Sequence, residues 1–420
     1  MSTSTSSSSA SCSHQKSKEE TVAHIVPKSI VVIGAGLAGF RVCEQLRTQG
    51  YTGTITLVGK EDALPYDRPP LSKQVLTGAW EPERASLCDA QAIKELDVDL
   101  RLGVSCVGLG VWTAHLSDGA ELRTDATIIA TGSVPCTIPG QPEGVLTLRT
   151  LQDSLALKDR LVPGSSLLIV GGGFIAAEVA TAARAAGVDV TVVEAAAQPC
   201  VRQLGERAGE LVGRLFEEAG VALRTRTPIA GFVDATTVEV AGGERITSDN
   251  VLVSVGSTPD VAWLQGTELP IGEGILAGGT GRVPPLPMVW ALGDSTSWWD
   301  QPRRGYARNE HWTSASDQAQ MVAADILLKD TPTLAPPYIW SDQFGMKIQV
   351  LGRPDIADEV VQLEGDGLEG GPVKGAVLGY RRGGHLLGVV SFGAPARFAG
   401  YRDQVVAGTK AITTVAVEID

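Results

Sequence analysis

Short apolar runs followed by amphipathic segments recur along this chain of 420 residues. From Ser29 the run SIVVIG leads into a helical segment that reaches about Gln49, and the run TITLVG follows the turn at Gly50. The same order returns where SLLIV leads into an alanine-rich helical segment to about Gly187 and then into VDVTVVE. Strand, helix and strand in this order predict parallel sheets covered by helices. The expected fold class is therefore α/β, with two Rossmann-like domains.

A glycine-rich turn joins strand to helix in the first unit. Gly34, Gly36 and Gly39 form the pattern G-x-G-x-x-G directly after the strand. The first glycine permits the tight turn, and the second lets the backbone approach a pyrophosphate at the helix N-terminus. An acidic residue at the end of the next strand would hold the ribose hydroxyls. Glu61 in LVGKED is the candidate, although an acidic loop residue in water would have the same pattern.

The second unit carries the same kind of turn, with Gly171 and Gly173 followed by Ala176 at the third position. Its next strand ends at Glu194, whose carboxylate would accept hydrogen bonds from a free ribose 2'-hydroxyl and repel a 2'-phosphate. The AAAQ that follows offers no Arg or Lys to bind such a phosphate. The second site is therefore predicted to prefer NADH over NADPH.

Two dinucleotide sites in one chain indicate a flavoprotein that takes a hydride from a nicotinamide, whereas one site alone would indicate a dehydrogenase. Two apolar strands that end in glycine, TIIATGSVP and VLVSVGSTP, have the form of crossings into and out of an inserted domain. Later, Gly293 and Asp294 follow the apolar run VWAL, and a helix is expected from about Ser314 to Leu328. The segment PYIWSDQFGMKIQVLG then begins a region of alternating strands.

Composition narrows the class of protein. A hydrophobic content of 43% with 20% charged residues is typical of a globular protein, and the serine-rich start up to about Lys28 predicts a disordered tail. We find neither a membrane-length apolar run nor a secretory signal, so a cytoplasmic location without membrane association is expected. The net charge of -13 argues against a nucleic-acid partner. One basic island could either dock an acidic partner or be a solvated face. It consists of Arg381, Arg382, Arg397, Arg402 and Lys410.

The six cysteines are scattered, and no two form a C-x-x-C or C-x4-C pair. This spacing excludes an iron–sulfur or zinc site, so no metal is expected, and it fits a reducing compartment. A disulfide or peroxide reductase on the same scaffold would need a reactive cysteine over the flavin. The first helix offers Cys43 alone, and KEDALPYDRPPLSK after the second strand has no cysteine.

Several motifs together resemble one family. They are the first glycine turn, LPYDRPPLSK (64–73), ATG (130–132), GGGFIAAE (171–178), ALGD (291–294) and IWSDQ (339–343). The chain from Ser29 onward is similar to the NADH-dependent ferredoxin reductases of bacterial oxygenase systems, the family of putidaredoxin reductase, rubredoxin reductase and the reductase of biphenyl dioxygenase. PYDRPPLSK and WSDQ distinguish this family from other flavin disulfide reductases, because many of those share the glycine motifs.

The resemblance implies three domains after the tail at 1–28. An FAD domain would be split between 29–140 and 260–328, an NAD domain would occupy 141–259, and an α+β domain at 329–420 would cover the flavin. The implied activity passes electrons from NADH through FAD to a two-iron two-sulfur ferredoxin that serves an oxygenase, such as an aromatic-ring-hydroxylating dioxygenase. A rubredoxin reductase and an NADH-binding flavoprotein like apoptosis-inducing factor are the alternatives. A monomer or a homodimer is expected.

The resemblance also assigns roles to single residues. Lys73 would lie beside the reactive ring nitrogen of the flavin with Glu178 as its partner, Asp294 would bind the ribityl chain, and Trp340 would lie at the ring edge. Each role has a plain alternative. Lys73 could be a surface lysine, Glu178 could favour the start of its helix, and Trp340 could be core packing. The backbone of Trp312 would contact the flavin ring. Further cofactor contacts are implied for Ala38, Arg68, Cys106, Ala130, Thr131, Gly132, Phe174, Ile175, Arg202, Gly256 and Gly293.

Three positions depart from the family pattern. Lys60 stands where an acid usually follows LVG, and Glu61 would take over that role from the next position. Val134 and Thr258 stand where arginines are usual, and the first of these arginines is expected to contact the FAD pyrophosphate. Charge-assisted hydrogen bonds contribute about 1.5 to 3 kcal/mol each. We therefore expect looser retention of FAD than in other family members.

Overall fold

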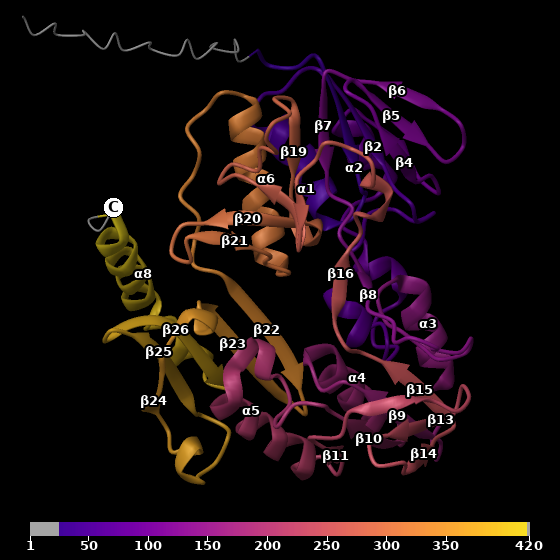
Figure 1. The fold of residues 1–420 in the computed structure, drawn as a ribbon, viewed down its shortest axis with the longest axis vertical. Coiled ribbons are helices and arrows are strands. Elements are labelled where there is room, and N and C mark those ends of the chain that lie inside the picture. Colours follow the sequence, from indigo (N-terminus) through magenta and orange to yellow (C-terminus); the bar gives the residue numbers. More distant parts are fainter. Residues whose placement is uncertain (1–24, 418–420) are drawn as a thin grey trace, which may run out of the picture.

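The computed structural model describes residues 25–417 and shows three packed units (Figure 1). Of the tail expected at 1–28, only 25–28 fall within the described residues. Within 25–417, no helix combines the length and the apolar character that a membrane crossing requires.

The first unit is built on a five-stranded parallel sheet in the order β19-β7-β1-β2-β3. Helices α1 (Leu37–Thr48) and α6 (Trp312–Ile326) pack against each other beside this sheet, and α6 begins at Trp312 rather than at Ser314. The strand β19 comes from late in the chain, so the sheet joins segments on both sides of the second unit. The strands are β1 (Ser29–Ile33), β2 (Thr54–Val58), β3 (Val98–Arg101), β7 (Ala126–Ile129) and β19 (Val289–Ala291).

Smaller elements surround this sheet. A short α2 (Ala90–Glu95) precedes β3, a three-stranded sheet covers one side, and a four-stranded sheet, β17-β18-β20-β21, follows the second unit in sequence. The first of these sheets holds β4 (Cys106–Leu109), β5 (Thr113–Leu116) and β6 (Glu121–Arg123). The second holds β17 (Ile271–Gly272), β18 (Gly274–Ala277), β20 (Thr296–Asp300) and β21 (Gly305–Ala307).

The second unit repeats the design with a four-stranded parallel sheet in the order β11-β10-β9-β15. Two antiparallel crossing strands, β8 (Ser133–Pro135) and β16 (Ser257–Pro259), connect it to the first unit. Its strands are β9 (Ser166–Val170), β10 (Asp189–Val193), β11 (Ala222–Arg224) and β15 (Asn250–Val253), with a small sheet of β12 (Ile229–Phe232), β13 (Thr237–Val240) and β14 (Arg245–Thr247). Its helices are α3 (Leu151–Arg160), α4 (Phe174–Ala185) and α5 (Val201–Glu218).

The C-terminal unit is an antiparallel sheet in the order β22-β23-β26-β25-β24 with α8 (Arg402–Val417) packed on β26. Its other face shares one hydrophobic core with the second unit, where Ile348, Tyr380 and Phe392 cluster with Phe216. The C-terminal sheet is thus fixed to the second unit by buried apolar surface. Its remaining elements are β22 (Tyr338–Gln343), β23 (Met346–Gly352), β24 (Glu359–Glu364), β25 (Val377–Arg382), β26 (His385–Phe392) and α7 (Pro395–Ala399).

Candidate functional site

One large cavity lies where the three units meet, with a volume of about 1800 Å³. Both glycine turns, the strands β8 and β16 and the start of β22 line it. Pockets for a single small ligand typically hold about 300 to 1,000 Å³. The cavity therefore has room for two dinucleotides.

The first glycine turn leaves an open helix N-terminus. Gly34 has φ +114°, and a Cβ there would lie 2.2 Å from the carbonyl oxygen of Ala130 at the end of β7. A Cβ on Gly36 would meet nothing within 4 Å, and no side chain caps α1. The first amides of the helix are therefore free to bind an anion from the cavity.

Gly39 has a different role from the other two glycines. It does not line the cavity, and a Cβ on it would lie 1.8 Å from the carbonyl oxygen of Gly34. Gly39 therefore lets α1 pack closely on the turn, and its part in cofactor binding stays a prediction.

The second turn has the same opening. Gly171 has φ +104°, with the carbonyl oxygen of Ser254 2.3 Å from a Cβ built there, and a Cβ on Gly173 would meet nothing within 4 Å. Glu194 lines the cavity and fixes the turn, because Oε2 accepts a hydrogen bond from the Gly172 amide at 2.5 Å and Oε1 accepts one from the Ala196 amide at 2.7 Å.

The corresponding carboxylate of the first unit is held by side chains. Glu61 pairs with Arg68 at 2.8 Å and accepts a hydrogen bond from the Tyr66 hydroxyl at 2.5 Å. Burial, and then the hydrogen bond to Glu61, raises the pKa of Tyr66 to about 12, so its hydroxyl stays a donor. Glu61 and Lys60 both line the cavity. The ribose role of Glu61 stays a prediction.

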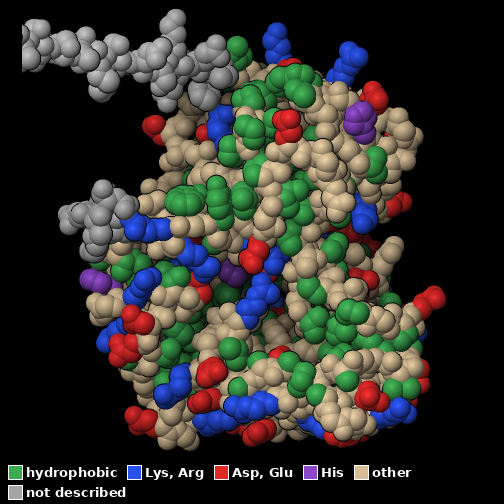
Figure 2. Space-filling view, viewed as in Figure 1, with side chains coloured by type: hydrophobic (Ala, Val, Ile, Leu, Met, Phe, Trp, Pro, Cys, Tyr) green, Lys and Arg blue, Asp and Glu red, His purple; other side chains and the backbone are tan. Residues whose placement is uncertain are grey.

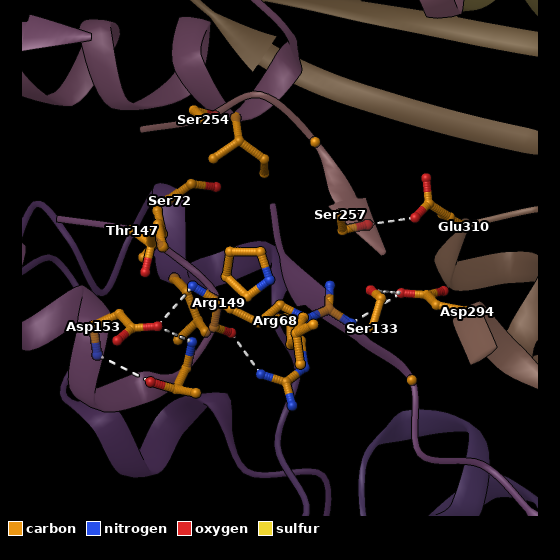
Figure 3. A pocket seen from close by; sticks show the side chains of 18 of the residues that line it. Arg68, Ser72, Ser133, Thr147, Arg149, Asp153, Ser254, Ser257, Asp294 and Glu310 are labelled. Carbon is orange, nitrogen blue, oxygen red and sulfur yellow. Dashed lines mark hydrogen bonds and ion pairs between the residues drawn. The ribbon is translucent and has the colours of Figure 1, made fainter. Parts of the chain in front are cut away.

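A cation that the sequence analysis did not name lies near the first turn. Arg149 precedes α3, and its Nη2 lies 2.9 Å from Oδ2 of Asp294, which also accepts a hydrogen bond from Ser133 at 3.3 Å (Figure 3). The Nε of Arg149 is buried without a hydrogen-bond partner. The expectation of loose FAD retention assumed that Val134 leaves this region without a positive partner. Arg149 removes the basis of that expectation.

The predicted pair of Lys73 and Glu178 is present in the wall of the cavity. Lys73 Nζ lies 2.8 Å from Glu178 Oε1, and the two side chains are only 12% and 3% exposed. These values exclude the plain alternative of a surface lysine. Ser72 and Ser341 also donate hydrogen bonds to the carboxylate of Glu178, at 2.5 and 2.6 Å.

Aromatic side chains form a continuous series from the cavity into the C-terminal unit. The rings of Trp312 and Trp340 meet edge to face with centroids 6.3 Å apart, and Tyr338 stacks on Trp340 at 5.9 Å. Phe398 of α7 lies 6.0 Å from Tyr338. Trp340 is therefore more than isolated core packing, because it links the cavity to the outer part of this unit.

The remaining predicted residues come together on the cavity wall. Residues 254–257 and 310–312 close another side, where the Ser257 hydroxyl donates to Glu310 at 2.5 Å (Figure 3). Arg202 pairs with Glu310 at 3.3 Å. Also lining the cavity are Ala38, Cys106, Ala130, Thr131, Gly132, Phe174, Ile175, Gly256 and Gly293.

Two cysteines line this cavity, Cys106 and Cys200, and burial raises the pKa of both thiols. Cys43 is fully buried, which raises its pKa to about 12. Cys200 lies next to the second turn, and burial raises its pKa strongly as well. Thiols of this kind stay protonated at neutral pH and are poor nucleophiles. The described part of the chain therefore does not favour a disulfide reductase.

Comparison with known sequences and structures places the chain. The family of pyridine nucleotide-disulphide oxidoreductases matches residues 28–319, and the reductase C-terminal family matches residues 338–418. The ferredoxin reductase component of chlorobenzene dioxygenase from Cupriavidus sp. (strain PS12) is 37% identical over 88% of this chain and 90% of its own. The ferredoxin–NAD(+) reductase component of the biphenyl dioxygenase system from Paraburkholderia xenovorans (strain LB400) is 36% identical over 82% of this chain and 86% of its own.

Solved structures agree with these relatives. The covalent complex of putidaredoxin reductase with putidaredoxin superposes with a TM-score of 0.85 at 28% identity, covering 90% of this chain and 93% of that one. The crystal structure of Fdr9 has a TM-score of 0.82 at 36% identity, covering 91% and 95%.

Proposed function

The chain belongs to the pyridine nucleotide-disulphide oxidoreductases that carry a reductase C-terminal domain, and from this premise we propose that it is an FAD-dependent NADH:ferredoxin oxidoreductase of an oxygenase system. One observation carries the proposal: two open glycine turns and the buried pair of Lys73 and Glu178 share one cavity. The names of the relatives favour an aromatic-ring dioxygenase as the terminal enzyme.

The residues around the first glycine turn fit FAD. The open N-terminus of α1 at Gly36 and the unpartnered Nε of Arg149 supply donors for a pyrophosphate, and Asp294 supplies an acceptor for hydroxyls. When bound, FAD supplies the chemistry that accepts a hydride from NADH and releases electrons singly. The second unit would hold NADH through Gly173 and Glu194.

The protein's own contribution to hydride transfer is positioning and charge. Lys73 holds a positive charge where the flavin ring is expected, so it can stabilise negative charge that develops there. Glu178 fixes the position of that ammonium group at 2.8 Å. The burial of both side chains keeps water away and strengthens the interaction.

Electrons would leave through the aromatic series toward an acidic partner. Trp340, Tyr338 and Phe398 lead from the cavity to α7, which contains Arg397, and Arg402 follows as the first residue of α8. Figure 2 shows Lys and Arg side chains gathered around the hollow between the units. A two-iron two-sulfur ferredoxin with an acidic surface is the proposed partner.

The structure divides the basic island into two groups. Arg381 and Arg382 end β25 at the turn of the β25–β26 hairpin, whereas Arg397 follows the far end of β26, a strand of 8 residues. At about 3.3 Å per residue, roughly 23 Å separate the two ends of this strand. Arg397 is next to Phe398 of the aromatic series in α7, and Arg402 begins the following helix, so we assign docking to these two.

The deciding experiment is NADH-driven reduction of cytochrome c with purified carriers added in turn. A two-iron two-sulfur ferredoxin should support rapid turnover, and a rubredoxin should not. Slow flavin reduction with a long-lived charge-transfer complex, and no reoxidation by any ferredoxin, would favour a function like that of apoptosis-inducing factor.

The docking assignment has a matched control within the island. Neutralising Arg397 and Arg402 to Gln should raise the apparent KM for the ferredoxin severalfold at low salt, because rim charges steer encounter. The same change at Arg381 and Arg382 should have little effect. Equal effects of both pairs would contradict the assignment.

A further inference from the structure

Strand β22 presents two chemically different faces. Successive side chains of a strand point to opposite sides. Tyr338 and Trp340 therefore share one face of β22, and Ser341 and Gln343 share the opposite face. The aromatic face meets Trp312 of α6. Ser341 and Gln343 are both 0% exposed and face α4 of the second unit. The established resemblance explains the aromatic face and leaves the polar face without a role.

The polar face contacts the carboxylate of Glu178 through Ser341. This carboxylate accepts hydrogen bonds from Ser72 at 2.5 Å and Ser341 at 2.6 Å, and it pairs with Lys73 at 2.8 Å. Ser72 and Lys73 come from the first unit, Glu178 from the second and Ser341 from the third. A buried carboxylate is stable only when its oxygens have partners, so all three units fix this one group.

Gln343 sets the direction of the Ser341 hydroxyl. Its Nε2 donates a hydrogen bond to Ser341 Oγ at 2.9 Å, which occupies an acceptor site of that oxygen. The hydroxyl hydrogen of Ser341 is then directed at Glu178. The strand is held in register with α4 by a second contact, because the Phe344 amide donates to Thr181 Oγ1 at 2.9 Å.

We propose that Ser341, oriented by Gln343, is a positioning residue for the hydride step: it fixes the Glu178 carboxylate, and through it the Lys73 ammonium. This inference rests on the proposed function. It gives the C-terminal unit a part in flavin reduction as well as in electron exit. The two activities share one strand, with the electron path on one face and the positioning contact on the other.

The first test is Ser341→Ala, read by single-turnover reduction of the flavin with NADH. We expect a rate about tenfold lower, because a hydrogen bond to a charged group is lost, with the dissociation constant for NAD+ within about twofold of wild type. Ser391→Ala is the matched control. Ser391 is also 0% exposed in the same sheet, and its hydroxyl has no hydrogen-bond partner.

The second test asks whether Ser341 acts through Lys73. In a Lys73→Met background, Ser341→Ala should cause no additional loss of rate, since residues that act as one unit are not additive. Thermal unfolding of the holoprotein gives a readout besides activity: Ser341→Ala and Glu178→Gln together should lower Tm by less than the sum of their separate effects.

These outcomes separate the two hypotheses. A full tenfold effect of Ser341→Ala in the Lys73→Met background, or an equal effect of Ser391→Ala, would overturn the positioning role and leave the proposed function intact. An unchanged rate in Lys73→Met alone would refute both the positioning role and the role of Lys73 in the proposed function. If Ser341→Ala does not fold, Gln343→Met tests the same contact, with a smaller slowing of about threefold expected.

Discussion

The two glycine turns follow one motif but tolerate different residues at its third position. In the first turn, a Cβ on Gly39 would lie 1.8 Å from the Gly34 carbonyl oxygen. In the second turn, Ala176 occupies the equivalent position and is fully buried. The helix of the second unit is therefore placed far enough from its turn to accept a methyl group. The same sequence pattern encodes two different helix-to-turn distances.

The carboxylates that follow the turns differ as well. Glu194 accepts hydrogen bonds from backbone amides of its own turn and of the following loop. Glu61 is held by the side chains of Arg68 and Tyr66. The carboxylate of the second site is thus held by backbone amides, which substitutions leave in place, whereas that of the first site is held by side chains, which a single substitution can remove. The first site should be more sensitive to single substitutions.

The largest effect is expected for Gly39→Ala. The added methyl group must push α1 away from the turn, which should cost about 3 kcal/mol of unfolding free energy and most of the bound FAD. Ala176→Gly should cost only about 1 kcal/mol, through helix propensity, and leave NADH binding nearly unchanged. Urea unfolding and the ratio of flavin to protein after purification measure both. Equal losses of unfolding free energy in Gly39→Ala and Ala176→Gly would contradict the difference in packing between the two turns.

Removal of Arg149 should have the next largest effect. Arg149→Ala deletes the cation beside Asp294, and the loss of about 1.5 to 3 kcal/mol should weaken FAD binding roughly 10- to 100-fold. The weaker binding can be measured as the amount of flavin released during dialysis, detected by its fluorescence. Arg101→Ala, which removes an exposed pair with Asp99 in the same unit, serves as control. Full retention of flavin in Arg149→Ala would show that this arginine does not contact the cofactor.

Glu194 tests the second site. The wild type should prefer NADH over NADPH, because the carboxylate repels a 2'-phosphate, and Glu194→Gln should reduce that preference about tenfold. The ratio of kcat/KM for the two nucleotides is the measurement. Equal use of NADPH by the wild type would be inconsistent with the proposed role of Glu194.

The smallest effect concerns pH and His311, which lines the cavity near Asp294. Burial lowers the pKa of His311 below its ordinary value of 6.5, so the unfolded chain binds this proton more readily than the folded chain. Stability should therefore fall as the pH drops below about 6.5, by at most about 1.4 kcal/mol per pH unit. His311→Asn should flatten this dependence in thermal unfolding scans from pH 7.5 to 5. An unchanged slope would exclude His311 as its source.

The C-terminal unit shows where sequence reasoning reached its limit. The pattern IWSDQ is specific enough to support a resemblance, and Trp340 could be assigned from it. The contact from Ser341 to Glu178 joins residues 163 positions apart in sequence. Only the shared hydrophobic core of the second and third units brings this strand to α4. A motif can indicate which residues are special without indicating which group they touch.

The amino-acid sequence alone was enough to predict the two strand, turn and helix units, because glycine requirements and helix N-termini depend on residues adjacent in the chain. It also determined the pairing of Lys73 with Glu178, through the family resemblance. The tertiary structure decided that Gly39 serves packing, that Arg149 supplies a cation where Val134 does not, and that Ser341 completes the partners of Glu178. Each of these depends on groups from distant segments, whose meeting is set by the packing of whole units.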